Sequence, residues 1–204
     1  IGQSGNVTPA DKKLYALRDV TATVDIIPLI ASSIMSKKLA SGSDTILLDV
    51  KFGSGAFMKD IDQARLLART MVDIGDHLHR DTRAILTDMD QPLGLAIGNS
   101  LEVIEAINTL NGKGPSDLVE LCLGAGAIML MQAKKTSSIE EGRKLLQEKI
   151  DNKEALEKLC DLVRAQGGDE SYIRDPSKFE KAKYIIAIKA ENEGYVKQIN
   201  ALEI

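Results

Sequence analysis

The sequence contains no tryptophan, only 3% aromatic residues and just two cysteines among its 204 residues. Its apolar fraction of 44% is ordinary, so we expect a core of normal size that is built from aliphatic side chains. The cysteines, Cys122 and Cys160, stand singly in segments with a helical apolar pattern. This usage is typical of a reducing cytosol, so we expect a cytoplasmic location and two buried, unreactive thiols.

Two further absences exclude classes of partner. No apolar run approaches the roughly 20 residues that a membrane-spanning helix needs, and no segment has the pattern of a signal peptide. The net charge is −4, and basic residues alternate with acidic ones along the chain, so no basic cluster is available for a phosphate backbone. We therefore expect neither a membrane nor a nucleic acid as a partner.

The first half of the chain has the order of a parallel α/β fold. One helix is predicted to begin near Thr8 and a second to cover residues 28–40. Residues 44–51 and 83–90 are short, β-branched, apolar runs that predict buried parallel strands, and an amphipathic helix beginning at Asp60 lies between them. A helix between two such strands predicts a parallel sheet with flanking helices.

The second half has a different pattern. From Asn99 onward it predicts a run of helices, with Ser138 and Asp151 among the capping residues. Residues 182–199 then predict two strands around a turn at Asn192. This hairpin stands outside the alternation of strand and helix.

Ser33 and Lys37 are candidate binding residues on the second predicted helix. They are four residues apart, so they lie on the same face, one turn from each other. A hydroxyl next to an ammonium can bind a carbonyl oxygen and an adjacent ring N–H. By spacing alone, an equally simple interpretation is that Lys37 extends along the surface and Ser33 fills a small contact.

Two other motifs are weak. Gly53-Ser54-Gly55 lacks the third glycine of a dinucleotide fingerprint and the Lys-Ser/Thr ending of a P-loop, so a tight turn is the better interpretation. His77 and His79 form an HxH pair without a third ligand nearby, and this arrangement favours a solvated helix end over a metal site.

Three segments together resemble the bacterial pyrimidine nucleoside phosphorylase and thymidine phosphorylase family in order and spacing: residues 11–38, DVKFGSGAFM (49–58) and LTDMDQPLGLAIGNSLEV (86–103). The resemblance covers essentially the whole chain. It implies phosphorolysis of uridine, thymidine or deoxyuridine to the free base and (deoxy)ribose 1-phosphate. The implied partners are a pyrimidine nucleoside and phosphate, and the implied assembly is a homodimer.

The resemblance also implies the organisation of the chain. The expected fold class is α/β, a parallel sheet with flanking helices plus a short helical segment from a separate all-α domain. Residues 1–43 would form a helical base-binding and hinge segment, residues 44–182 the α/β domain, and residues 183–204 the start of an incomplete β-containing domain. The family's phosphate-binding segments match nothing in the sequence and would lie upstream of Ile1. We therefore expect the isolated chain to be inactive.

The resemblance assigns the pyrimidine-binding residues. Arg18, Ser33 and Lys37 match the family's base-holding residues, and Phe57 matches an aromatic residue that lines the base pocket. When the glycosidic bond breaks, the base leaves as an anion, so cations and donors directed at its oxygens would stabilise the transition state. One position departs from the family pattern, because Ile26 stands where a serine is usual.

A structural potassium ion is the cofactor that the resemblance implies. Its expected ligands are Leu93, Ala96 and Glu105, completed by an upstream loop. Carbonyl and carboxylate oxygens are hard ligands that suit such a cation and do not suit zinc. Without the resemblance, the same residues predict only a loop and a surface glutamate.

Two alternative functions remain open at this stage. The chain could be a non-catalytic structural α/β fragment, or it could belong to a phosphoribosyltransferase of related fold. The second alternative requires a pyrophosphate-binding site, which would lie upstream of Ile1.

Overall fold

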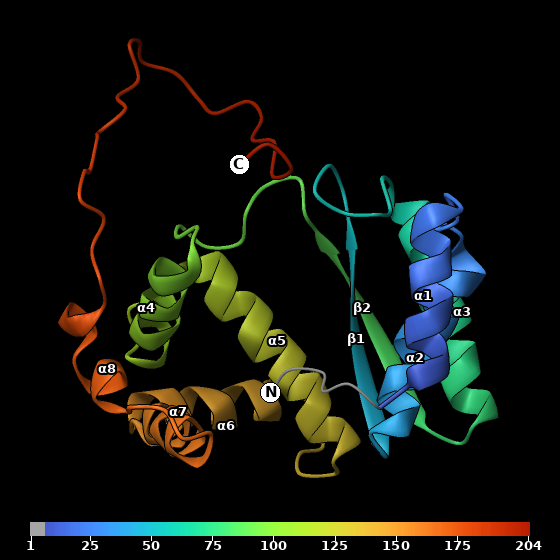
Figure 1. Cartoon of the computed structure of the whole chain (residues 1–204). Coiled ribbons are helices and arrows are strands. Elements are labelled where there is room, and N and C mark those ends of the chain that lie inside the picture. The colour runs from blue at the N-terminus through green and yellow to red at the C-terminus, as the bar shows by residue number, and fades with distance from the viewer. Residues whose placement is uncertain (1–6) are drawn as a thin grey trace. The chain divides into compact units, whose positions relative to one another are not determined.

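The computed structural model describes residues 7–204, which belong to two compact units (Figure 1). The first unit comprises Ile1–Gln91 together with Asn200–Ile204, and the second comprises Pro92–Ile199. The three-part division expected from the sequence stays a prediction about a longer protein.

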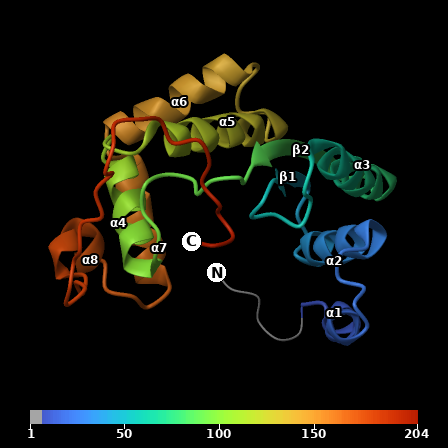
Figure 2. The same cartoon turned by 90° about the horizontal axis from the view of Figure 1, so that it is seen from above.

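The first unit is a parallel pair of strands covered by helices (Figures 1 and 2). α3 packs on both strands, α2 packs on α3, and α1 packs on α2. The strands pair in parallel, in register from Thr45 opposite Asp81 to Phe52 opposite Asp88. The predicted α/β class and parallel pairing are therefore confirmed. The elements are α1 (Pro9–Val20), α2 (Ile27–Ala40), β1 (Thr45–Phe52), α3 (Ile61–His77) and β2 (Asp81–Asp88).

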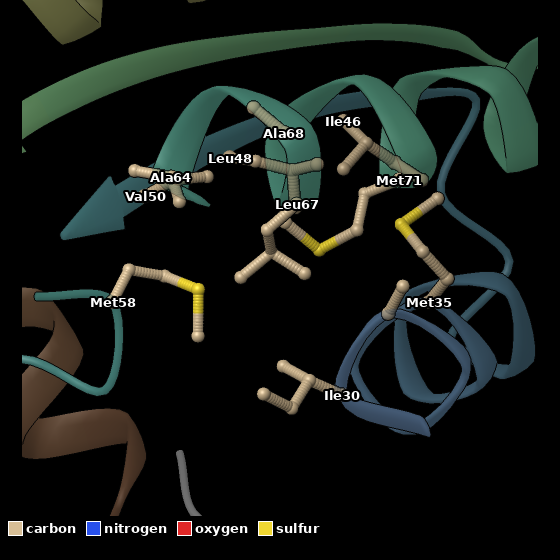
Figure 3. Packing of buried hydrophobic residues seen from close by; sticks show 11 residues of the cluster. Ile30, Met35, Ile46, Leu48, Val50, Met58, Ala64, Leu67, Ala68 and Met71 are labelled. Atoms are coloured by element: carbon tan, nitrogen blue, oxygen red, sulfur yellow. The ribbon is translucent and has the colours of Figure 1, made fainter. Parts of the chain in front are cut away.

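The core of this unit lies between β1, α2 and α3 (Figure 3). Alternate β1 side chains are buried, and α3 buries residues spaced three and four apart, as amphipathic elements do. Met35 and Met71 are 0% and 1% exposed, and burying such a side chain contributes roughly 1.5–3 kcal/mol. The cluster contains no buried aromatic residue, as the composition predicts. Its buried members are Ile30, Ala31, Met35, Ile46, Leu48, Val50, Met58, Ala64, Leu67, Ala68 and Met71.

Gly75 lets the last turn of α3 lie directly against β2. A Cβ at this position would be 1.9 Å from Thr82 Oγ1, far inside van der Waals contact. Any other residue would push the helix away from the strand, so the close approach of α3 and β2 depends on this glycine.

The second unit is helical. α5 and α6 pack most extensively, and their close crossing depends on Gly142, where a Cβ would be 2.9 Å from the Cα of Ala127. Among residues 7–204, no helix combines the length and the apolarity needed to cross a membrane. The elements are α4 (Asn99–Leu110), α5 (Ser116–Gln132), α6 (Ile139–Asp151), α7 (Glu154–Ala165), α8 (Ser171–Arg174) and the 3₁₀ turn η1 (Pro176–Lys178).

The two cysteines have different environments in this unit. Cys160 is fully buried in a cluster with Ile107 and Ile173, as predicted. Cys122 is exposed, so the prediction that both thiols are buried is wrong for this residue. Cys122 precedes the buried Ala127 by five residues, so the two side chains are about 140° apart around the axis of α5. The apolar run of α5 did not indicate which of its faces would pack.

The predicted hairpin over residues 182–199 is not formed. This segment contains neither helix nor strand, and apolar side chains such as Ile188 and Tyr195 are fully exposed. A two-stranded hairpin is at best marginally stable unless its apolar face packs on something else. None of the described residues covers these side chains, so alternating sequence alone is insufficient for pairing here.

Side-chain caps define two helix starts as predicted. The Asp60 carboxylate accepts two backbone N–H groups of the first turn of α3, and Ser138 Oγ accepts the N–H of Glu141. Asp151 is not a cap, because it ends α6, and α7 begins only after Lys153.

Ile26 leaves the start of α2 without a side-chain cap. It is the N-cap residue, with an extended backbone (φ −80°, ψ 113°) and no side-chain hydrogen bond. Serine is among the preferred residues at this position because its hydroxyl accepts a backbone N–H of the first turn. Here that N–H belongs to Leu29, which donates to the Ile26 carbonyl at 2.9 Å. A serine at this position would add a side-chain acceptor that Ile26 does not provide.

We predict that Ile26→Ser stabilises the chain by about 0.5 kcal/mol, the lower end for a serine cap, because the Leu29 N–H already has the Ile26 carbonyl as a partner. Ile26 is 44% exposed, so little apolar burial is lost. The measurement is the free energy of unfolding in urea, and Ile26→Ala is the control that removes the isoleucine without adding a hydroxyl. A serine variant no more stable than the alanine variant would contradict the capping interpretation.

Candidate functional site

α1 and α2 together place a charged cluster beside Ser33. Lys37 Nζ lies 2.6 Å from Asp11 Oδ2 and donates hydrogen bonds to the backbone oxygen and to Oγ of Ser33, each at 2.9 Å. Ser33 is 6% exposed, and the side chains of Lys37 and Asp11 are 31% and 12% exposed. The predicted pair of Ser33 and Lys37 is thus brought together, and Asp11 joins it from the other helix.

The electrostatics of the cluster favour an ionised Asp11. Burial raises the pKa of its carboxyl, but hydrogen bonds from Lys37 and Ser33 and the charges of Lys37 and Arg18 outweigh burial and lower the pKa below its usual value. A lowered pKa means that this carboxylate stabilises the fold at neutral pH, and that the stabilisation is lost as the pH falls through the lowered pKa. Asp11 is therefore a charged partner of Lys37 at neutral pH.

Arg18 is buried, and its guanidinium binds the connection between α1 and α2 and the first turn of α2. Nε donates to the Thr23 carbonyl at 3.2 Å, Nη1 to that of Leu29 at 3.1 Å, and Nη2 to that of Val24. The guanidinium carbon also lies 5.2 Å from the centre of the Tyr15 ring, within the range of a cation–π contact. Arg18 therefore holds α1 and α2 together, and its positive charge helps to lower the pKa of Asp11.

Sequence reasoning missed Asp11 and Tyr15 as members of this site. In the sequence, Asp11 is an acid in the first turn of a helix, where it favours the positive end of the helix dipole. With Arg18, these residues are spaced four and three apart, which places all three on one face of α1. That spacing was the signal that could have identified them.

Phe57 lies apart from this cluster, at the carboxyl end of β1. It is 64% exposed and lines an apolar cavity of about 570 Å³ whose lining includes neither Ser33 nor Lys37. The cavity is lined by four consecutive β1 residues, Leu48 to Lys51, and by side chains of α2 and α3. The structure therefore does not join Phe57 to the other three predicted base-binding residues.

The Gly53-Ser54-Gly55 loop has no backbone N–H available for a phosphate. Gly53 N donates to the Met58 carbonyl at 3.0 Å, Gly55 N to that of Met89 at 3.1 Å, and Ser54 N to an Asp90 carboxylate oxygen at 2.7 Å. A phosphate cradle requires such N–H groups to point at the ligand. The tight-turn interpretation of this motif is confirmed.

The predicted potassium ligands are only partly brought together. Ala96 and Glu105 line a common cavity of about 540 Å³ in the second unit, whereas Leu93 is not part of its lining. Glu105 Oε1 accepts the N–H of Leu95 at 2.9 Å, so the carboxylate binds the backbone of the loop between β2 and α4. Across the described chain, no group of three His, Cys, Asp or Glu side chains is arranged for a metal. The oxygen chemistry suits potassium, although the described residues supply few of the ligands that it needs.

The HxH pair is placed at the end of α3. His77 is its last residue and is exposed, and its Nδ1 lies 2.7 Å from the Asp73 carbonyl oxygen. This contact uses one ring nitrogen within the helix itself. The structure thus supports the interpretation of a solvated helix end.

Comparison with known proteins gives a consistent result. Residues 1–156 match the family described as glycosyl transferase family, a/b domain. The chain is 60% identical over 201 residues to a pyrimidine-nucleoside phosphorylase of Geobacillus stearothermophilus, covering 98% of this chain and 46% of that protein. It is 58% identical over 204 residues to the Bacillus subtilis (strain 168) pyrimidine-nucleoside phosphorylase and 57% identical to that of Staphylococcus haemolyticus, covering 100% of this chain and 47% of each relative. The chain thus spans about half the length of these relatives.

Proposed function

This chain belongs to the glycosyl transferase family whose a/b domain it matches, and from that membership we propose that its full-length protein phosphorolyses pyrimidine nucleosides. The products are the free base and the (deoxy)ribose 1-phosphate, and this chain supplies the base-binding part of the site. The observation that supports this assignment best is the cluster of Lys37, Ser33 and Asp11, which presents a fixed cation and a hydroxyl side by side. A cytoplasmic location and a homodimer belong to the same proposal.

In the proposed mechanism, phosphate attacks the anomeric carbon while the base leaves as an anion. Lys37 and Arg18 are assigned to the two carbonyl oxygens of the base, where the negative charge develops, and Ser33 to the ring nitrogen. Because all three N–H donors of Lys37 are paired with Asp11 and Ser33, Lys37 must exchange one of these partners for the base. Arg18 has five N–H donors and uses three on carbonyl groups, so two remain for a ligand. Phe57 is assigned to the ring face, which requires it to move toward the cluster or the cluster toward it.

Phosphate itself is bound outside the Gly53-Ser54-Gly55 loop in this proposal, because all three backbone N–H groups of that loop are already paired. The phosphoribosyltransferase alternative would likewise have to bind its pyrophosphate outside this loop. That function needs a pyrophosphate site, and this loop is the part of the described chain that most resembles one.

The test is an assay of the purified full-length protein with uridine or thymidine, with and without phosphate. The proposal requires release of the base that depends on phosphate and yields the sugar 1-phosphate in equal amount. Hydrolysis to free sugar, or no release of the base, would exclude it.

We further propose that the full-length protein binds potassium through the carbonyls of Leu93 and Ala96 and the Glu105 carboxylate. Support comes from the shared cavity of Ala96 and Glu105 and from the hydrogen bond that holds Glu105 on the Leu95 backbone. A cation of low charge density needs many oxygen ligands, so further ligands would have to come from outside these residues.

Glu105→Gln should therefore reduce the stabilisation of the full-length protein by potassium. A bound ion raises stability by mass action, by about 1.4 kcal/mol at ten times its dissociation constant. The measurement is Tm with potassium varied at constant ionic strength against a large organic cation. Glu148→Gln, at an exposed position on α6, is the matched control. An equal response of wild type and Glu105→Gln would remove Glu105 from the cation site.

A further inference from the structure

The loop that carries Phe57 is closed on itself. The N–H of Gly53 donates to the Met58 carbonyl at 3.0 Å, and the N–H of Ala56 donates to the Gly53 carbonyl at 3.1 Å. Met58 is 3% exposed and packs in the core cluster, so the end of the loop is fixed (Figure 3). Phe57 therefore stands beside a fixed residue, while it lines the apolar cavity and is itself 64% exposed.

Asp90, just beyond the end of β2, fixes the other side of this loop. Its carboxylate oxygen Oδ1 accepts the backbone N–H of Ser54 at 2.7 Å, and its carbonyl accepts the Ser54 hydroxyl at 3.3 Å. Hydrogen bonds to a carboxylate are shorter and about twice as strong as those between neutral groups. Gly53 permits this approach, because a Cβ at its position would be 2.8 Å from the same carboxylate oxygen.

Lys59 binds the same stretch of backbone with the opposite charge. Its Nζ donates to the Ser54 carbonyl at 3.1 Å and to the Ala56 carbonyl at 2.8 Å. The N–H of Ser54 thus meets a carboxylate and its carbonyl meets an ammonium, so both main-chain groups of one residue are bound by charged side chains. Lys59 lines the cavity, whereas Asp90 does not. Asp90 would therefore act on a ligand in the cavity through the loop.

We propose that Asp90 is a positioning residue for the pyrimidine, because it holds residues 53–58 so that Phe57 keeps its place at the cavity. The inference rests on the proposed function, in which Phe57 covers the face of the ring, and adds to it the residue that keeps Phe57 there. An anchored loop holds Phe57 still. The movement that the proposed function requires is then that of α1 and α2 toward Phe57.

The loss of this anchor should affect substrate binding more than the chemical step. An aromatic ring that stacks on the base contacts it equally in the ground state and in the transition state, so its loss raises KM and leaves kcat nearly unchanged. A loop that holds Phe57 in place for only part of the time lowers the apparent affinity by that fraction. Partial unfolding acts differently, because it lowers kcat and leaves KM as it was.

The decisive variant is Asp90→Ala in the full-length protein, which removes the carboxylate and leaves the backbone of residue 90 in place. We expect KM for uridine to rise by roughly fivefold or more, with kcat within about twofold of the wild-type value. Asp90→Asn keeps an oxygen acceptor for the Ser54 N–H, so its KM should be within about twofold of wild type. Both constants are measured from uracil release at varied uridine concentration and saturating phosphate.

Two further variants separate positioning from a general loss of structure. Asp76→Ala removes the same side chain from an exposed position in the last turn of α3, and it should leave KM and Tm unchanged. In a Phe57→Ala background, which itself raises KM, Asp90→Ala should raise KM no further, because the ring that Asp90 positions is gone.

Four results would overturn the inference. Two concern residue 90 itself: an Asp90→Ala variant with the KM of wild type, or an Asp90→Asn variant as impaired as Asp90→Ala. The others concern the ring: an unchanged KM in Phe57→Ala, or a further rise when Asp90→Ala is added to it. A wild-type full-length protein that releases no base from uridine would instead refute the proposed function, so the two failures are distinguishable.

Discussion

The 204-residue chain alone should release no detectable uracil from uridine and phosphate, whereas the full-length protein should do so readily. Phosphate must be held against the anomeric carbon to react, and well-oriented groups gain an effective molarity on the order of 10⁵ M or more. The best phosphate-loop candidate in the described chain, Gly53-Ser54-Gly55, has its backbone N–H groups paired with Met58, Met89 and Asp90. Without a held nucleophile, this gain is absent.

The measurement is uracil release by the purified chain over long incubation, with the full-length protein as the positive control. A circular dichroism spectrum with the helical content of the structure must accompany it, so that inactivity is not confused with unfolding. Turnover that copurifies with the chain through two unrelated separations would contradict this prediction and show that a phosphate site exists within these residues.

Lys37→Ala in the full-length protein should lower kcat/KM for uridine by roughly 100-fold or more. Removing one donor directed at developing charge typically costs about 3 kcal/mol. The loss of the ammonium also leaves the Asp11 carboxylate, which is only 12% exposed, without its closest partner. Lys38→Ala is the matched control, because Lys38 is the next residue of α2 and is exposed. A loss of only two- or threefold would favour the interpretation that Lys37 merely extends along the surface.

Arg18→Ala should produce a similar loss of activity, but with an additional loss of stability. Arg18 pairs with two carbonyl groups of the α1–α2 connection and one in the first turn of α2, and its removal leaves these three carbonyls without their guanidinium donors. The double variant with Lys37→Ala should be far less impaired than the product of the two single effects, because both residues serve one leaving group. Tm measured beside kcat/KM separates the two roles of Arg18.

Local sequence was sufficient for most of the fold of the first unit. The apolar runs at β1 and β2 and the amphipathic period of α3 are short-range patterns, and they predicted strands, helix and parallel pairing correctly. The same rules failed for residues 182–199, where the pattern of two strands is present but nothing in the described chain packs on them. Strand propensity depends on a partner surface, which a local pattern does not specify.

For the site, the sequence by itself determined that Ser33 and Lys37 lie one turn apart on one helix, because helical spacing is a local property. Only the tertiary structure decided that Asp11 meets Lys37, since that contact depends on how two helices pack across 26 residues of chain. The packing also directs Arg18 at carbonyl groups of the α1–α2 connection and of α2, and it keeps Phe57 away from the cluster. Hydrogen bonds between separate elements form only where packing brings donors and acceptors within about 3 Å, and no spacing along the chain encodes that distance.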